Sequence, residues 1–567
     1  MSETPFLPGG GPSAQADGFA RDNLPPQDLW PRMDYGTLPE LRAYPARINA
    51  ARLLLDRHVA EGRGDRPAIY FEDKVWSYAA LKDRSDRVAR VLTEELGLVP
   101  GNRVLLRGPN NPMMAAAWFG VLKAGGICVA TMPLLRAREL AFIIEKARIR
   151  LALCDIALAE EMEAAKKRSA GLERIAYFSG TGDSVRGDAD LDRRMAATRP
   201  GFAIIDTAAD DLALIAFTSG TTGQPKGTMH FHRDVMAMCD CFPRYTFKGA
   251  PDDIYTGSPP LAFTFGLGAM LCFPLSLGAS TVLLEKFTPD SLLETIARYR
   301  VTALYTAPTG YRAMTELVSK HDIASLRKCV SAGETLPLPT FEAWREATGI
   351  RIIDGLGSTE MLHIFVSASE EGIRPGATGK AIPGYEARVV DDAGNPVPPG
   401  TLGNLAVRGP TGCRYLDNLE RQRAYVQNGW NLPGDIYVQD EDGYFHYQAR
   451  ADDMIISAGY NISGPEVEAV LLDHPKVREC AVVASPDPER GFIAKAYVVL
   501  RRAEDANPAT VKVLQDFVKG EIAPYKYPRR IEFVEQLPRT ETGKVQRFKL
   551  RQRELEHAQD SSRAGAG

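Results

Sequence analysis

One glycine-rich stretch constrains the fold of this chain more than any other part of its sequence. Three glycines, four hydroxyl side chains and a lysine fall within the ten residues of Thr218-Ser219-Gly220-Thr221-Thr222-Gly223-Gln224-Pro225-Lys226-Gly227, directly after the apolar run 212–217. Glycines let backbone N–H groups turn toward an anion, and hydroxyls and a lysine donate to phosphate oxygens. The pattern predicts a strand that ends in a polyphosphate-binding loop. Its Pro-Lys-Gly ending excludes a Walker A loop, which needs Gly-Lys-Ser/Thr; the alternative is an ordinary surface turn.

Composition favours small-molecule chemistry in a protein of several domains. A chain of 567 residues is too long to fold around one hydrophobic core, so several domains are expected. Its contents of 44% hydrophobic and 25% charged residues are ordinary for globular proteins. A net charge of −4 and a pI of about 6.2 do not favour a nucleic-acid or anionic membrane partner. No segment is typical of a targeting signal or of a bilayer span. The eight cysteines are scattered, mostly within apolar runs, which indicates buried thiols in a reducing compartment and hence a cytoplasmic protein.

The hydrophobic pattern predicts an α/β fold in two domains. Short apolar runs alternate with helical patterns from 46 to about 375, which predicts two α/β subdomains with mostly parallel sheets. From about 376 to 450, strand and turn signals predict a small β-barrel module. The expected organisation is therefore a mobile N-terminal segment, a large N-terminal domain of two α/β subdomains plus the β module, a hinge, a small mobile C-terminal α+β domain and a disordered tail. Their expected boundaries are 1–45, 46–450, 451–453, 454–556 and 557–567.

Four further stretches carry residue types suited to nucleotide chemistry. Gly355-Leu356-Gly357-Ser358-Thr359-Glu360 follows a predicted strand, at the sheet edge where α/β proteins bind ligands. Asp435 lies in a tight turn, the polar stretch 450–456 lies at the expected hinge, and Lys544 follows Gly543 near the C-terminus. Each has an ordinary alternative, since Glu360 could cap a helix, Asp435 could form an Asx turn and Lys544 could be a solvated cation. Their joint occurrence in this order favours function.

These stretches together resemble the adenylate-forming superfamily, which includes acyl-CoA synthetases, adenylation domains of non-ribosomal peptide synthetases and beetle luciferases. The resemblance covers about residues 46–555. It implies a two-step reaction. A carboxylate attacks the α-phosphorus of ATP to give an acyl-adenylate and pyrophosphate, and a thiol then attacks the acyl carbon and releases AMP. The implied cofactors are ATP and Mg²⁺, with coenzyme A as co-substrate.

The resemblance also implies a role for each matched residue. The catalytic residues would be Lys544, Glu360, Thr218 and Lys226, and Mg²⁺ would be held by Glu360 and Thr218. The ATP- and AMP-binding residues would be Thr218, Ser219, Gly220, Thr221, Thr222, Gly223, Lys226, Gly333, Glu334, Thr335, Asp354, Gly355, Leu356, Gly357, Ser358, Thr359, Glu360, Asp435, Arg450 and Lys544. The acyl pocket would comprise Phe263, Phe265, Gly266, Gly333, Leu356 and His363. Coenzyme A would contact Ser457, Ala458, Gly459 and Tyr460, although Gly459 could equally be a turn residue. Asp452 would be the hinge about which the C-terminal domain turns between the two steps.

Departures from the superfamily pattern point to an aromatic substrate. Leu356 stands where an aromatic residue is usual, and Phe263 stands where histidine is usual, so both changes make the pocket more apolar. The stretch 357–365 is similar to benzoate-CoA ligases, whereas 228–234 and 260–268 are similar to 2-aminobenzoate-CoA ligases. We therefore expect an aryl-CoA ligase for benzoate or 2-aminobenzoate, with a small-molecule acid, ATP and CoA as its partners and a homodimer as its possible assembly.

Several alternatives remain open at the level of sequence. The chain could be a medium-chain or alicyclic acyl-CoA ligase, a stand-alone adenylation enzyme that loads a carrier protein, or a nucleotide-binding scaffold. His363 could accept a hydrogen bond from an ortho-amino group or serve only in packing. His230 and His232 flank Phe231 without a third nearby ligand, so they are not expected to bind a metal.

Overall fold

The computed structural model describes residues 12–183, 189–219, 225–333, 336, 338–450, 454–538, 545 and 547–564. Its internal contacts divide the chain into two compact units. The first comprises 1–133, 141–217 and 227–449, and the second comprises 134–140, 218–226 and 450–567. Each unit is described by itself below.

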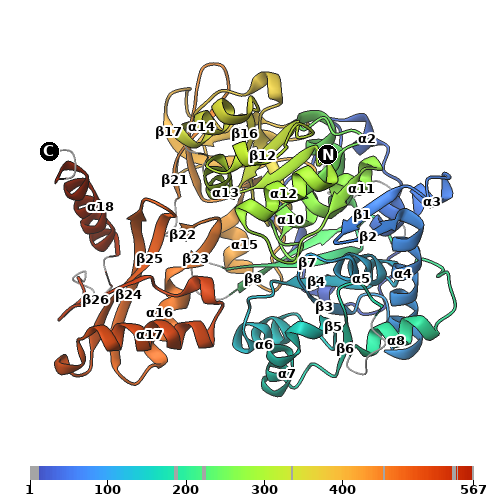
Figure 1. Ribbon diagram of the computed structural model, residues 1–567, viewed down its shortest axis with the longest axis horizontal. Coiled ribbons are helices and arrows are strands. Elements are labelled where there is room, and N and C mark those ends of the chain that lie inside the picture. The colour runs from blue at the N-terminus through green and yellow to red at the C-terminus, as the bar shows by residue number, and fades with distance from the viewer. Residues whose placement is uncertain are drawn as a thin grey trace. The chain divides into compact units, whose positions relative to one another are not determined.

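A nine-stranded sheet forms one half of the first unit (Figure 1). Its strands are β1 Pro67–Phe71, β2 Lys74–Ser77, β9 Ile254–Gly257, β10 Ser280–Val282, β11 Ala303–Thr306, β12 Lys328–Ala332, β13 Ile352–Gly357, β14 Ile364–Ser367 and β15 Lys380–Ala381. Their order is β15-β14-β13-β12-β11-β9-β10-β1-β2. The six central strands β13, β12, β11, β9, β10 and β1 pair in parallel. At the edges, β2 pairs antiparallel with β1, and β14 and β15 extend the sheet antiparallel beyond β13.

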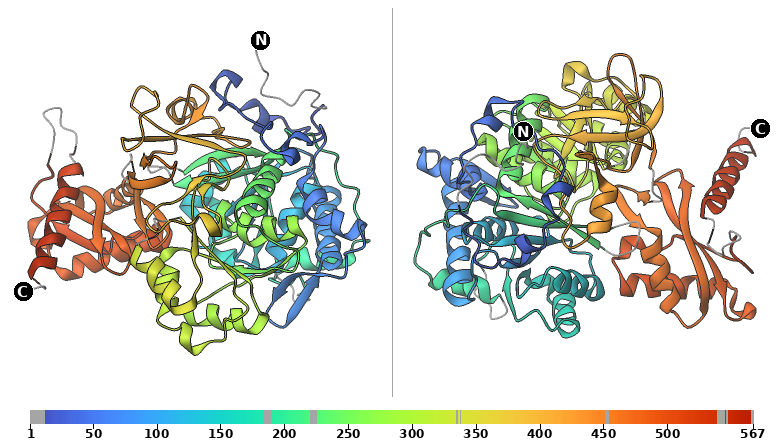
Figure 2. Two further views of the ribbon diagram at one scale, coloured as in Figure 1. Left: turned by 90° about the horizontal axis from the view of Figure 1, so that it is seen from above. Right: turned by 180° about the vertical axis from the view of Figure 1, so that it is seen from behind.

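A second sheet has six strands in the order β6-β5-β3-β4-β7-β8. They are β3 Arg103–Arg107, β4 Ile127–Thr131, β5 Leu151–Asp155, β6 Arg174–Phe178, β7 Leu212–Ser219 and β8 Pro225–Phe231. The pairs among β3 to β7 are parallel, which confirms the predicted α/β class. The strands of the two sheets do not follow one another along the chain, however. The early hairpin β1–β2 completes the sheet formed by later strands (Figure 2), and β7–β8 complete the earlier sheet.

Helices cover these sheets and join their strands. They are α3 Arg57–Ala60, α4 Tyr78–Arg90, α5 Pro112–Lys123, α6 Ala137–Lys146, α7 Ala159–Arg168, α8 Asp190–Ala197, α9 His232–Cys241, α10 Thr264–Leu267, α11 Phe273–Leu277, α12 Pro289–Tyr299, α13 Pro308–Thr315 and α14 Leu338–Thr348. Helix α4 illustrates the link to sequence. The Ser77 hydroxyl caps it by accepting from the Ala80 N–H, and Leu81 and Val88 are fully buried on its apolar face.

The predicted β module is an antiparallel sheet of six strands. It contains β16 Glu386–Val390, β17 Leu402–Arg408, β18 Val426–Gln427, β19 Trp430–Asn431, β20 Asp435–Gln439 and β21 Phe445–Arg450, with helix α15 Leu419–Tyr425 before β18. The turn Asp391–Asn395 is closed as the sequence predicts, because the Asp391 carboxylate accepts from the backbone N–H groups of Ala393 and Asn395.

Residues 12–45 belong to the segment expected to be mobile. This part forms α1 Phe19–Asp22 and α2 Pro39–Arg42 and is anchored by apolar and charged contacts. The Trp30 side chain is 5% exposed and donates to the Pro25 carbonyl at 2.7 Å, and Arg103 pairs with Asp17 at 2.6 Å. The Gly/Pro-rich composition obscured these few anchoring side chains.

The second unit is built on the sheet β23-β22-β25-β24, with β26 beside β25. Its elements are β22 Met454–Ser457, β23 Tyr460–Ser463, α16 Gly464–Asp473, β24 Val477–Asp487, β25 Gly491–Leu500, α17 Pro508–Glu521, β26 Arg530–Phe533 and α18 Arg547–Ala564 (Figure 1). Alternate strand residues face opposite sides. Val482 and Val498 pack with α16 and α17, whereas Val483 and Val499 cluster with Leu550 of α18.

The expected disordered tail 557–567 overlaps helix α18, which continues to residue 564. Glu554 holds this polar helix to the sheet, because its buried carboxylate accepts from Ser485 at 2.6 Å and pairs with Lys495 at 2.7 Å. Among the described residues, no helix combines the length and apolar character needed to cross a membrane.

Candidate active site

Strand β13 leads into the loop that carries Glu360. A Cβ atom at Gly357 would lie 2.7 Å from the His363 carbonyl oxygen, so only glycine allows the close approach of β13 and β14 there. Beyond it, the Met361 N–H donates to the Ser358 carbonyl at 3.2 Å, and Leu362 adopts φ = 72°. Of the predicted glycine loop 355–360, Gly355–Gly357 lie on β13, and 358–360 begin the tight turn into the antiparallel strand β14, so Glu360 caps no helix.

The Glu360 carboxylate is held by one tyrosine. The Tyr415 hydroxyl donates to Glu360 Oε1 at 2.7 Å. Tyr425 packs edge-on against Tyr415, with ring centres 5.8 Å apart, and its own hydroxyl lies 3.2 Å from Ser358 Oγ. Burial, reinforced by the Glu360 charge, raises the pKa of Tyr415 well above its usual value, so its hydroxyl remains a hydrogen-bond donor.

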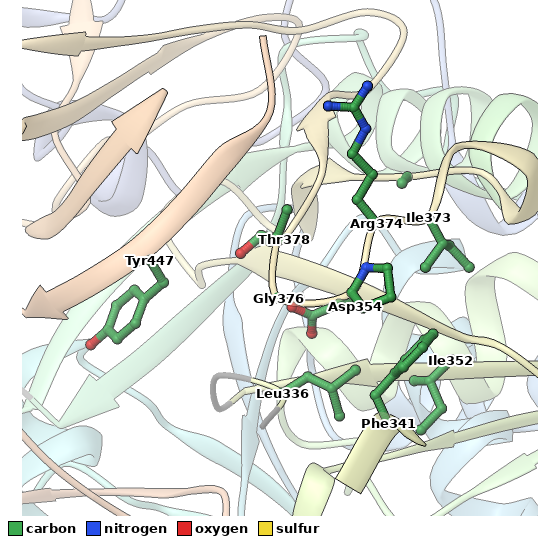
Figure 3. Close-up of a pocket in the computed structure, with 12 residues that line it drawn as sticks. Leu336, Phe341, Ile352, Asp354, Ile373, Arg374, Gly376, Thr378 and Tyr447 are labelled. Carbon is green, nitrogen blue, oxygen red and sulfur yellow. The ribbon is translucent and has the colours of Figure 1, made fainter. Parts of the chain in front are cut away.

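Asp354 lies on the wall of a pocket in the first unit. Figure 3 shows its side chain among Leu336, Phe341 and Ile352 on one side and Gly376 and Thr378 on the other. One carboxyl oxygen, Oδ1, is buried and has no hydrogen-bond partner among the described residues. Burial raises the pKa of Asp354 to about 8. A buried acceptor left open in this way makes the pocket a candidate site for a ligand that donates a hydrogen bond.

The raised pKa leads to a prediction for Asp354→Asn. The protonated carboxyl is favoured in the folded state, because its pKa lies near 8 against 3.8 unfolded. This contribution to stability is fully present below pH 4 and lost as the pH rises through 8. As the pH rises from about 4 to about 8, the free energy of unfolding of the wild type should therefore fall relative to that of the variant, by up to about 1.4 kcal/mol per pH unit. Calorimetric melting of both proteins from pH 5 to pH 9 tests this, and parallel curves would contradict it.

An aromatic cluster surrounds His363 in the predicted acyl pocket. The imidazole centre lies 4.4 Å from the ring of Phe273, 5.7 Å from Phe265 and 5.9 Å from Phe242. Burial lowers the pKa of His363 to about 3, so the ring is neutral. Its Nε2 lies 3.3 Å from the Phe265 carbonyl, which can only accept, and therefore Nε2 carries the proton. Nδ1 is then a buried acceptor that has no partner among the residues the structure describes.

Two positions beside this cluster have room only for glycine. A Cβ atom at Gly268 would lie 2.4 Å from His363 Cδ2, and one at Gly266 would lie 2.0 Å from the Pro260 carbonyl oxygen. Both glycines thus let helices approach the cluster closely. Phe263 precedes α10, and Leu356 packs at the margin of the core.

Asp435 begins β20 directly after Gly434, whose φ of 87° makes the preceding turn possible. The Asp435 side chain is buried. Burial, and to a smaller extent the Asp435 charge, raises the pKa of Tyr437 well above its usual value. This predicted nucleotide-binding residue is thus a buried carboxylate at the start of a strand.

The histidines after the phosphate-type loop have structural partners. His230 Nε2 lies 2.9 Å from the Thr359 carbonyl, and the Ala50 N–H donates to His232 Nδ1 at 3.1 Å. Burial lowers the pKa of each to about 4. Both are therefore neutral, and His230 links β8 to the Glu360 loop.

In the second unit, the predicted coenzyme A segment is the hairpin between β22 and β23. Its turn residues Ala458 and Gly459 both have positive φ, 48° and 83°, as a two-residue hairpin of this kind requires. Arg490 Nε donates to Ser457 Oγ at 3.3 Å, and the ring centres of Tyr460 and Tyr525 lie 4.4 Å apart.

Three further predicted nucleotide-binding residues lie on strands. Thr218 lies on β7, Lys226 lies on β8, and Arg450 ends β21.

The structure brings some predicted residues together and does not describe others. Ser358, Glu360 and Thr359 share one loop, and Phe265 contacts His363. Predictions for Gly220, Thr221, Thr222, Gly223, Glu334, Thr335, Asp452 and Lys544 lie outside the described residues. Sequence reasoning missed Tyr415, Tyr425 and Phe273, which contact Glu360, Ser358 and His363. No local motif marks these three, since each reaches its partner only through the fold.

Family models and known proteins match this arrangement. The family model described as AMP-binding enzyme matches residues 56–415, and the AMP-binding enzyme C-terminal domain matches residues 466–544. The chain belongs to the AMP-binding enzyme family. It is 34% identical over 524 residues to a benzoate–CoA ligase of Thauera aromatica. The aligned region covers 91% of this chain and 98% of that relative.

Two solved structures extend the likeness to the fold. One is an anthranilate CoA ligase, AuaEII, in complex with anthranoyl-AMP, with a TM-score of 0.70, 35% identity and coverage of 91% of this chain and 99% of that one. The other is the amide bond synthetase McbA from Marinactinospora thermotolerans, with a TM-score of 0.79, 29% identity and coverage of 89% and 99%. This chain is an adenylate-forming enzyme, an acid–thiol ligase of the AMP-forming type.

Proposed function

We propose that the enzyme is an ATP-dependent aryl-CoA ligase and that 2-aminobenzoate is its preferred substrate, with benzoate second. The observation that carries this proposal is the His363 cluster. Phenylalanine rings suit a flat aromatic acid, and the buried acceptor Nδ1 of neutral His363 suits an ortho-amino donor. Benzoate-CoA and anthranilate-CoA ligases among the relatives support the same substrate class.

The proposed reaction has two balanced steps. A carboxylate oxygen of the acid bonds to the α-phosphorus of ATP, and the bond to the β-phosphate bridging oxygen breaks, which releases pyrophosphate. The thiolate of coenzyme A then bonds to the acyl carbon, and AMP leaves with the phosphate oxygen. Lys544 would offset the repulsion between the two anions in the first step, and Lys226 with the hydroxyls of the glycine-rich loop would hold the departing pyrophosphate.

The residues of the first unit have matching proposed roles. The unpartnered Oδ1 of Asp354 would accept from the exocyclic amino group of adenine, and Asp435 would accept from the ribose hydroxyls. Between the steps, the C-terminal domain would turn about Asp452, and Ser457, Ala458, Gly459 and Tyr460 would line the path of the pantetheine arm.

The donor set fits Mg²⁺. The described residues contain no cluster of three acidic, histidine or cysteine side chains that could bind a metal alone. Mg²⁺ is commonly held by one or two carboxylates together with substrate phosphates. Glu360 offers one carboxylate, and Thr218 would add a hydroxyl. When bound, the ion neutralises charge that develops on the phosphates.

One substrate panel tests the proposal. AMP release would be measured with CoA present for 2-aminobenzoate, benzoate, cyclohexanecarboxylate, phenylacetate and octanoate. We expect the highest kcat/KM for 2-aminobenzoate, then benzoate. Turnover of octanoate alone would overturn the aryl assignment. A parallel arm replaces CoA with a simple amine, because a structural relative is an amide bond synthetase; turnover with the amine but not with CoA would overturn the thiol ligase.

A further inference from the structure

A short segment of the β module lies along strand β8. Tyr415 forms an antiparallel bridge with Thr228. On either side, the Met229 N–H donates to the Arg414 carbonyl at 2.8 Å, and the Leu416 N–H donates to the Gly227 carbonyl at 2.9 Å. The backbone of Tyr415 is therefore fixed to the strand that leaves the glycine-rich loop.

The Tyr415 side chain has little freedom. It is 1% exposed, and Tyr425 packs edge-on against its ring. The Tyr415 N–H donates to Gln422 Oε1 at 2.9 Å, and Gln422 Nε2 in turn donates to the Cys413 carbonyl at 3.1 Å. The hydroxyl that reaches Glu360 Oε1 is thus presented from a rigid, packed position.

A second contact joins β8 to the same loop. His230, two residues after Thr228 on β8, lies with Nε2 2.9 Å from the Thr359 carbonyl. Burial lowers the pKa of His230 to about 4, so the neutral ring donates through Nε2–H. Strand β8 therefore supports the loop at Thr359 directly and at Glu360 through Tyr415.

The Glu360 carboxylate depends on this support. Among the described residues, Glu360 makes no other hydrogen bond or ion pair than the one from Tyr415. Oε1 is occupied, and within the described part of the chain Oε2 has no protein partner. Without the tyrosine hydroxyl the carboxylate could rotate away from any one orientation, whereas Mg²⁺ demands near-ideal octahedral geometry.

We propose that Tyr415 is a positioning residue for adenylation. It holds Glu360 Oε1, which would leave Oε2 available to the metal–triphosphate, and it ties the Glu360 carboxylate to strand β8. This inference rests on the proposed metal-binding role of Glu360. Partners that orient a ligand in this way typically change metal affinity by about 10–100-fold when they are removed.

The test is Tyr415→Phe, which keeps the ring and removes only the hydroxyl. We expect the Mg²⁺ concentration for half-maximal adenylation to rise about tenfold. Binding of Mn²⁺ to the enzyme–ATP complex, measured by the paramagnetic resonance signal of free Mn²⁺, should weaken by the same factor. Tyr78→Phe is the matched control, because Tyr78 is equally buried and its hydroxyl makes one 2.7 Å hydrogen bond, to the Ala279 carbonyl away from this loop.

Three outcomes separate the inference from the function on which it rests. If Glu360→Gln weakens Mn²⁺ binding and Tyr415→Phe does not, the positioning role of Tyr415 is wrong and the role of Glu360 stands. If Glu360→Gln leaves Mn²⁺ binding unchanged, the metal-binding role itself fails. If Tyr78→Phe shifts Mn²⁺ binding as much as Tyr415→Phe, the effect is one of general stability and the inference falls.

Discussion

Replacing Lys544 with alanine is expected to lower the rate of adenylate formation by about 10²–10³-fold. In the first step a carboxylate must approach a triphosphate, and one cation at the point of attack offsets the repulsion between them. The second step has no such requirement, because the thiolate meets a neutral acyl carbon. The variant should therefore convert supplied acyl-adenylate and CoA to thioester at close to the wild-type rate. Pyrophosphate exchange and thioester formation, measured separately, give the two rates.

A matched control for this variant lies in the same unit. Lys512→Ala removes an exposed lysine that pairs with Asp516 at 2.7 Å on α17. We expect it to change neither half-reaction, since such surface pairs contribute little to stability. Equal loss of both half-reactions in Lys544→Ala would argue against its role in adenylation alone, and wild-type exchange would remove it from catalysis.

Glu360→Gln is expected to reduce adenylation by about 10²-fold at saturating ATP and Mg²⁺. The glutamine side chain has the same shape, and its carbonyl oxygen can still accept from Tyr415, so the fold should be retained. What is lost is the charge that would hold Mg²⁺ against the phosphates. Pyrophosphate release, followed across a Mg²⁺ titration, should show a lower plateau and a weaker metal dependence than the wild type.

The control for Glu360→Gln is Glu371→Gln, which removes an exposed carboxylate that pairs with Lys248 at 2.9 Å. That variant should match the wild type in both plateau and metal dependence. A wild-type plateau for Glu360→Gln would show that the carboxylate charge does not take part in the reaction.

Much of the local structure could be predicted because it depends on short-range patterns. The helix over 78–96 follows from apolar spacing and appears as α4 with a π-helical continuation Val91–Glu95. The glycine stretch after the apolar run could also be recognised, but the strand end could not be placed, because β13 continues through Gly355-Leu356-Gly357, which pair with β14. The exchange of the hairpin β1–β2 into the later sheet could not be foreseen. The position of the hairpin depends on β1 pairing in parallel with β10, far along the chain, and no local sequence pattern indicates that partner.

The contacts at the candidate site show the same limit. Glu360 could be singled out by its motif, but Tyr415 is 55 residues further along the chain and reaches it only because β8 and the β module meet there. Phe273 likewise reads as an ordinary core residue and becomes part of the His363 cluster through the helices that approach at Gly268. Composition could not reveal the contacts of residues 12–45, where a few buried anchors stand among glycines and prolines.

In the proposed reaction a carboxylate attacks the α-phosphorus of ATP before CoA reacts. An isotope experiment tests this order by supplying 2-aminobenzoate labelled with ¹⁸O in both carboxylate oxygens, together with ATP, Mg²⁺ and CoA, and determining the mass of each product. We expect one ¹⁸O in AMP, one in the acyl-CoA carbonyl and none in pyrophosphate. Label in orthophosphate with formation of ADP, or unlabelled AMP, would contradict it.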